Sequence, residues 1–137
     1  MTNPAAVPGG TLLLDSEGLA KAVQREREAT GWLALARADD MRVVTSAAIL
    51  VEVMHPTIKR PAFEWTLSHV VVEPVTEGIA RHAAALLADA GLHGHKYAID
   101  AMLCATALAA PGPVIVLTSD PDDLRTLCGG RVTLIKI

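Results

Sequence analysis

The sequence predicts an α/β fold in which helices cover both faces of a parallel sheet, and three observations lead to this prediction. Several short apolar runs lack polar alternation, which is typical of strands covered on both faces. Segments of helical character lie between these runs, so that strands and helices alternate along the chain. Of the 137 residues, 51% are hydrophobic but only 3% are aromatic, and Ala, Leu and Val dominate. This composition favours packed helices over an all-β sandwich.

The chain length suits one domain, which we expect to span residues 11–137. Residues 1–10 are rich in Pro, Gly and Ala and carry no Lys or Arg. We therefore expect a flexible N-terminal tail there, and no signal peptide. The sequence contains no long uninterrupted apolar stretch of the kind that spans a membrane, which predicts a cytoplasmic protein.

Five apolar runs are the predicted strands: residues 11–14, 43–44, 70–72, 114–117 and 132–135. The helix expected over residues 76–90 places Ile79, Ala83 and Leu86 on one stripe, and Gly91 is a suitable residue to end it. Two further helices, over residues 47–55 and 98–110, are apolar nearly all round. That pattern predicts that both lie in the interior.

Two acids interrupt these apolar helices. Glu52 is the only acidic or basic residue besides His55 in residues 47–55, and Asp100 is the only charged residue in 98–110. A buried carboxylate is costly unless it is paired, hydrogen-bonded or bound to a metal. Either residue alone could reach solvent or an arginine at a helix edge, but two such acids on two apolar helices indicate a functional site.

Two more acids follow predicted strands. Asp15 directly follows the first strand, and Asp120 closely follows the fourth. In open parallel sheets, ligands bind outside the carboxyl ends of the strands. Helix capping explains both residues equally well, because Asp120 precedes Pro121 and two further acids, and Asp15 precedes Ser16. Both interpretations remain open at this stage.

Four converging acids without a matching Cys or His partner indicate a hard cation such as Mg²⁺ or Mn²⁺. The chemistry that such a site favours is hydrolysis of a phosphodiester by metal-activated water. Cys104 and Cys128 lie in predicted helices and are expected to be small buried residues. His93 and His95 form a His-x-His pair that could bind zinc, but a solvated loop explains them better.

Four blocks of the sequence, in order, resemble the PIN-domain ribonucleases, in particular the VapC-type toxins of type II toxin–antitoxin systems. The blocks are residues 12–16, 45–53, 97–107 and 116–124, and each contains one of the four acids. The resemblance implies a PIN-like three-layer sandwich with a five-stranded parallel sheet. It also implies a Mg²⁺-dependent (or Mn²⁺-dependent) ribonuclease site, an RNA substrate, a cognate antitoxin protein and a homodimer.

By this resemblance, Asp15 and Asp100 would be the principal metal ligands. Glu52 and Asp120 would complete the acidic pocket, directly or through water, and Asp123 is a candidate fifth acid. The segment between Glu52 and Thr76 matches the family least, so the resemblance assigns no substrate-binding role to Lys59, Arg60 or Trp65. Trp32 and Trp65 are expected in the core or in a dimer interface.

Other functions remain to be weighed against a nuclease. The net charge of −3 argues mildly against extended contact with nucleic-acid phosphates. A catalytically silent PIN-fold protein that binds an antitoxin-like partner is the main alternative, because sequence cannot show turnover. An aspartyl-phosphate phosphatase is disfavoured because Glu17 stands where a second Asp is needed. A phospho-receiver is disfavoured because Lys136 has no helix after it.

Overall fold

The computed structural model describes residues 9–137, so residues 1–8 of the expected tail lie outside the described part of the chain. Within residues 9–137 there are five strands and seven helices. The strands are β1 (Thr11–Leu14), β2 (Arg42–Ser46), β3 (Val71–Glu73), β4 (Val114–Thr118) and β5 (Thr133–Lys136). The helices are α1 (Ser16–Val23), α2 (Arg27–Ala38), α3 (Ala47–Val53), α4 (Arg60–Leu67), α5 (Glu77–Ala90), α6 (Gly94–Ala109) and α7 (Pro121–Cys128).

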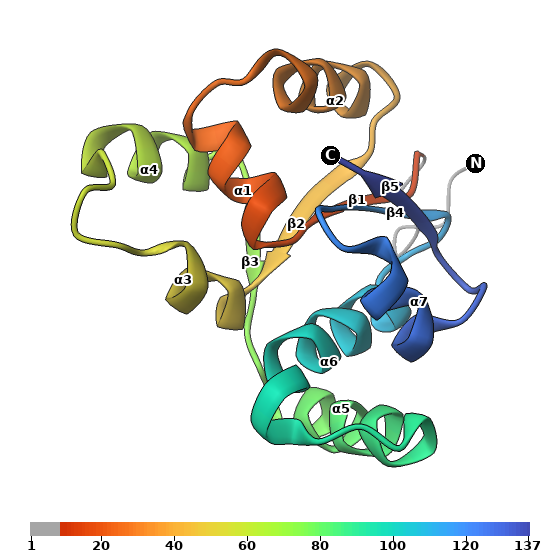
Figure 1. The fold of residues 1–137 in the computed structure, drawn as a ribbon. Coiled ribbons are helices and arrows are strands. Elements are labelled where there is room, and N and C mark those ends of the chain that lie inside the picture. Colours follow the sequence, from red (N-terminus) through yellow and green to blue (C-terminus); the bar gives the residue numbers. More distant parts are fainter. Residues whose placement is uncertain (1–8) are drawn as a thin grey trace.

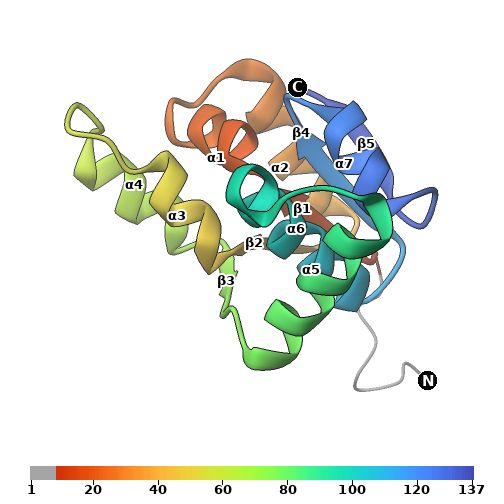
Figure 2. The same ribbon diagram turned by 60° about the horizontal axis from the view of Figure 1, so that its bottom comes forward.

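All five strands join one parallel sheet in the order β3-β2-β1-β4-β5. Helices α1, α2 and α4 lie on one side of this sheet, and α5, α6 and α7 lie on the other (Figure 1). Figure 2 shows the same arrangement turned, with α3 at one end of the sheet. The predicted α/β fold with a five-stranded parallel sheet is confirmed. No helix among the described residues is both long and apolar enough to cross a membrane.

The centre of the sheet is formed by the most apolar run of the chain. Leu12, Leu13 and Leu14 of β1 are at most 1% exposed. They pair with β2 on one side and β4 on the other, and Leu14 is aligned with both Thr45 and Leu117. Because every strand is parallel, the residues that follow β1, β2 and β4 meet at one edge of the sheet. This edge is the carboxyl edge.

Before β1, Gly9 and Gly10 are tied to the rest of the domain. The backbone N–H of Gly9 donates to Asp40, and Gly10 accepts from Arg42. Gly10 has a φ of +84°, and a Cβ there would lie only 2.1 Å from the carbonyl oxygen of Pro113. A residue with a side chain would therefore clash at this turn into the central strand.

Helix boundaries follow local capping chemistry. Thr76 caps α5 by accepting from the N–H of Ile79, and Gly91 ends that helix in the left-handed conformation, as the sequence predicts. Helix α6 is interior: five consecutive residues, 103–107, are buried. Cys104 in α6 and Cys128 in α7 are free and buried, which confirms the expectation for both.

Helix α3 is less buried than the sequence predicts. Ile49 and Val53 are buried in the core, but Val51 is 76% exposed and Met54, just after the helix, is 39% exposed. The expectation that this helix is wholly interior is therefore wrong for the side that carries Val51. The sequence of α3 is apolar all round, so it does not indicate which side is covered. Trp65 of α4 is also exposed, at 52%, and does not lie in the core. Trp32, in contrast, packs against the core.

Candidate functional site

Asp15 lies at the carboxyl edge, directly after β1, and caps α1. One carboxylate oxygen, Oδ1, accepts a hydrogen bond from the N–H of Gly18 at 2.7 Å, and Oδ2 accepts from the N–H of Ser119 at 3.3 Å. The residue is only 8% exposed. Burial raises its pKa, although these two N–H groups and the Thr118 hydroxyl favour the charged form. A nearly buried carboxylate is thus held at the junction of β1 and β4.

Asp100, in the first half of α6, is the residue whose pKa the other acids affect. Burial is the largest of the causes that together raise its pKa to about 6, and the negative charges of Glu52, Asp123, Asp15 and Asp120 are the others, in that order. These four residues belong to α3, α7 and the N-caps of α1 and α7. The structure therefore brings the four predicted acids and Asp123 into one neighbourhood, the acidic cluster (Asp15, Glu52, Asp100, Asp120 and Asp123).

Asp120 caps α7, so the capping interpretation of this residue is correct. Its Oδ1 accepts from the N–H of Asp123 at 3.4 Å, and its own N–H donates to the hydroxyl of Thr118 at 3.0 Å. Its side chain is nevertheless exposed and its charge reaches Asp100. Capping and membership of the acidic cluster are therefore compatible. Partial burial and the adjacent Asp120 raise the pKa of Asp123, while the positive charge of Lys96 lowers it.

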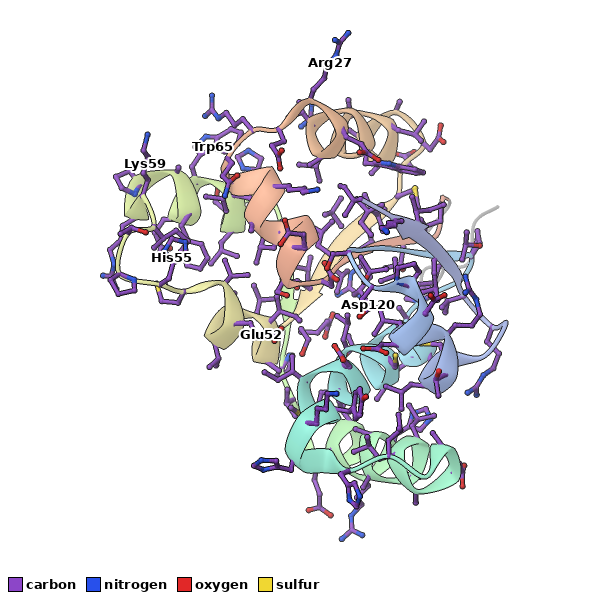
Figure 3. The ribbon with its side chains drawn as sticks, viewed as in Figure 1. Arg27, Glu52, His55, Lys59, Trp65 and Asp120 are labelled. Carbon is purple, nitrogen blue, oxygen red and sulfur yellow. The ribbon has the colours of Figure 1, made fainter. Side chains whose placement is uncertain are left out.

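Glu52, like Asp120, is an exposed member of the acidic cluster. It lies in α3, which contacts both α1 and α6. Figure 3 shows Glu52 and Asp120 on opposite sides of the region between α1 and α6. Since Glu52 is the carboxylate that raises the pKa of Asp100 most, α3 places its charge beside α6 while leaving the side chain open to solvent.

The donor set of the acidic cluster fits a hard divalent cation, because all its side-chain donors are carboxylate oxygens. Mutual repulsion within the cluster, which after burial is the other cause of the raised pKa of Asp100, would be relieved by a bound cation. Within residues 9–137, no three His, Cys, Asp or Glu side chains already stand in an arrangement that could hold a metal ion. His93 and His95 are both exposed.

Two further residues of this region were not assigned to the site from the sequence. Thr118, at the end of β4, is 1% exposed, and its hydroxyl interacts with Asp15 and with the N–H of Asp120. A buried threonine between an apolar strand and an acid is the signal that could have identified it. Lys96, at the start of α6, lies close enough to Asp123 to lower the pKa of that carboxyl group.

Comparison of the fold with solved structures finds several chains of similar size. A chain of VapBC2 from Rickettsia felis, bound to a DNA fragment from their promoter, matches with a TM-score of 0.70 at 13% identity, covering 93% of this chain and 98% of that one. A toxin–antitoxin complex from Klebsiella pneumoniae matches with 0.67 at 23% identity, covering 93% and 100%. FitAcB from Neisseria gonorrhoeae matches with 0.61 at 20% identity, covering 91% and 96%.

At these low identities, the TM-scores show similarity of fold alone. The family is shown by comparison of the sequence. A search of curated proteins finds no significant match. The family model of the PIN domain, however, matches residues 12–129. This match contains the whole acidic cluster and all of the sheet except Thr11 and β5. The chain therefore belongs to the PIN-domain family.

Proposed function

We propose that this chain is a metal-dependent endoribonuclease that hydrolyses RNA phosphodiesters. The observation that carries the proposal is the convergence of carboxylates from α3, α6 and the N-termini of α1 and α7 on Asp100, at the carboxyl edge of the sheet. A structural role does not account for such a cluster, because like charges that share a site destabilise the fold. Membership of the PIN-domain family supports the same activity, since nucleases of this family typically depend on metal ions.

Asp15 and Asp100 are the proposed principal ligands of Mg²⁺ or Mn²⁺, and Glu52, Asp120 and Asp123 complete the cation site directly or through water. When bound, the cation supplies an acidic water molecule and neutralises charge on the phosphodiester. Asp15 suits its role because two backbone N–H groups hold both of its carboxylate oxygens. Its position is fixed before the cation arrives.

Glu52 is the proposed base, or the residue that orients the attacking water. Its side chain is exposed and its charge acts on Asp100 from a separate helix, so it can accept a proton and release it to solvent. Thr118 is a positioning residue, since its hydroxyl connects Asp15 to the backbone before α7. No nucleophilic Ser or Cys is required.

We further propose that the protein is the toxin of a toxin–antitoxin pair and acts in the cytoplasm, where it forms a homodimer and binds a cognate antitoxin. The support is the similarity in fold to chains from toxin–antitoxin complexes, along nearly the full length of both chains. The exposed apolar residues Val51 and Met54 of the α3 region are suitable for contact with another protein chain.

The decisive experiment is cleavage of structured RNAs by the purified protein, with Mg²⁺ or Mn²⁺ and with EDTA. Cleavage should require the metal and should return when the metal is restored. The alternative is a catalytically silent PIN-fold protein that binds an antitoxin-like partner. It would be indicated by Mn²⁺ binding to the purified protein without cleavage of any RNA tested, and cleavage that persists in EDTA would contradict the metal mechanism.

A further inference from the structure

A pocket of about 450 Å³ lies between α1, the segment after α3 and the start of α4. Its apolar lining includes Val23, Val53 and Ile58, and its polar lining includes three groups of potential positive charge, Arg25, His55 and Lys59. No Asp or Glu among residues 9–137 lines it. We call it the cationic pocket. Its charge is opposite in sign to that of the acidic cluster and to the net charge of the chain, which is −3.

The cations of the pocket are not neutralised by the protein. Neither Arg25 nor Lys59 forms a salt bridge with any residue in the described part of the chain. The guanidinium of Arg25 lies over the Trp65 ring, 4.9 Å from its centroid, which limits the positions it can adopt. The ring of His55 is oriented by a hydrogen bond between Nδ1 and Thr57 Oγ1 at 3.0 Å. Arg25 and His55 are thus pre-positioned, and the charges of Arg25 and Lys59 are available to a ligand.

Two helices connect the cationic pocket to the acidic cluster. Helix α1 begins at the Asp15 cap and contributes Ala20 and Val23 to the pocket, and Val23 lies about 12 Å along the helix from Asp15 at 1.5 Å per residue. Helix α3 carries Glu52 in the cluster and Val53 in the pocket. In Figure 3, His55 and Lys59 lie beyond Glu52 on the side away from Asp120. An extended ligand that crosses the acidic cluster can therefore continue into the cationic pocket.

We propose that the cationic pocket binds the phosphodiester backbone of the RNA strand, on one side of the bond to be cleaved. This inference rests on the proposed nuclease function. Lys59, His55 and Arg25 contact backbone phosphate, and the apolar lining receives a ribose or base. The acidic cluster repels a polyanion, so attraction from neighbouring cations is needed to hold the strand across it. RNA is favoured over an acidic peptide because α1 and α3 each connect the pocket to the proposed site of phosphodiester cleavage.

The test is binding of a short single-stranded RNA, labelled with a fluorophore, to the full chain in the presence of EDTA. All variants carry Asp100→Asn, which prevents cleavage and weakens repulsion equally in each. Lys59→Gln should weaken RNA binding about fivefold, because one charge-assisted phosphate contact is lost. The slope of log affinity against log salt should become shallower by about 0.7. His55→Gln is a second variant and should also weaken binding.

The matched control is Arg27→Gln, which removes the same charge from an exposed side chain. Arg27 is at the start of α2 and points away from the rest of the molecule (Figure 3). It should change RNA affinity less than twofold, and thermal melting should show that all variants are folded. If Lys59→Gln and His55→Gln bind RNA as Arg27→Gln does, the proposal is overturned. It is also overturned if they bind RNA normally but lose affinity for polyglutamate, because the pocket would then be a protein-binding site.

This experiment separates the pocket from the nuclease. Weaker RNA binding by Lys59→Gln supports the pocket even if the parent protein cleaves no RNA with Mg²⁺ or Mn²⁺, in which case only the proposed activity fails. Metal-dependent cleavage together with unchanged RNA binding by Lys59→Gln and His55→Gln gives the opposite result, in which the nuclease stands and the pocket is rejected.

Discussion

Glu52 on α3 raises the pKa of Asp100 on α6 more than any other carboxylate does, and together with burial it helps to bring that pKa to about 6. This relationship links two helices that the sequence marks as apolar, each with one acid. It also means that the acidic cluster is under electrostatic strain when no cation is bound. The first two predictions use this strain, because it changes with pH in a defined direction.

Asp100→Asn should stabilise the metal-free protein at about pH 8. The pKa of Asp100 is raised in the folded state from an ordinary 3.8 to about 6, so ionisation costs the folded state more than the unfolded state. The cost is absent below about pH 4, grows between the two pKa values and is complete above about pH 6. After allowance for partial exposure, we expect a gain of about 1 to 2 kcal/mol, measured by urea unfolding in EDTA.

The control for this prediction is Asp89→Asn, an exposed carboxylate on α5. Asp89→Asn should have little effect on the free energy of unfolding at about pH 8. A large loss of stability in Asp100→Asn at about pH 8 would mean that Asp100 is a structural residue, and the functional interpretation of the acidic cluster would be weakened.

Metal affinity should fall as the pH is lowered through about 6. A cation competes with the proton that Asp100 binds in this range, so binding at about pH 5 should be about tenfold weaker than at about pH 7.5. Calorimetric titration with Mn²⁺ measures this change, and titrations in buffers of different ionisation enthalpy should show release of a proton near pH 6. An affinity that does not change between these pH values would exclude Asp100 as a ligand.

Asp15→Ala and Asp100→Ala should each reduce RNA cleavage by several orders of magnitude. Each loses a ligand of a site that acts as a unit, so the double variant should be little worse than either single variant. Asp15→Ala also loses the cap of α1, and this costs about 1 kcal/mol of folding stability, which circular dichroism melting measures separately. A folded Asp100→Ala protein with normal cleavage would place the activity elsewhere.

Thr118→Val should disturb the site without removing an acid. The substitution keeps the shape of a buried residue but leaves the N–H of Asp120 without its acceptor and Asp15 without a hydroxyl. We expect a loss of about 1 to 2 kcal/mol in unfolding free energy and a lower Mn²⁺ affinity. Thr118→Ser keeps the hydroxyl and should restore most of the Mn²⁺ affinity.

Gly18→Ala should affect Asp15 through the backbone. A Cβ at Gly18 would lie 3.0 Å from the carbonyl oxygen of Leu117 and 3.4 Å from Oδ1 of Asp15. Since Leu117 belongs to the central part of the sheet, α1 must move away from β4. We expect a loss of about 1 to 3 kcal/mol, measured by urea unfolding. Gly31→Ala on α2, where a Cβ meets nothing within 4 Å, is the control and should not destabilise the protein.

The strands were predictable because each includes a short apolar run, and all five predicted runs overlap observed strands. Helix α4 (Arg60–Leu67) was not predicted, since Pro61 and several polar residues interrupt its apolar spacing. The open face of α3 could not be predicted either, because its sequence offers no polar side to mark solvent. The acids were recognisable from their apolar surroundings. The cationic pocket was not, because Arg25 and Lys59 are distant in sequence and are brought together only by the packing of α1 against α4.

The hydrogen bond from the N–H of Ser119 to Asp15 spans 104 positions of the chain and places the beginning of the acidic cluster in contact with its end. During synthesis on a ribosome, Asp15 leaves the exit tunnel long before β4 exists to pair with β1. The central strand then has only β2 beside it, and the N–H that holds Oδ2 of Asp15 has not yet been made. An incomplete nascent chain therefore cannot assemble this cluster, and the cell is exposed to it only after almost the whole polypeptide has been translated.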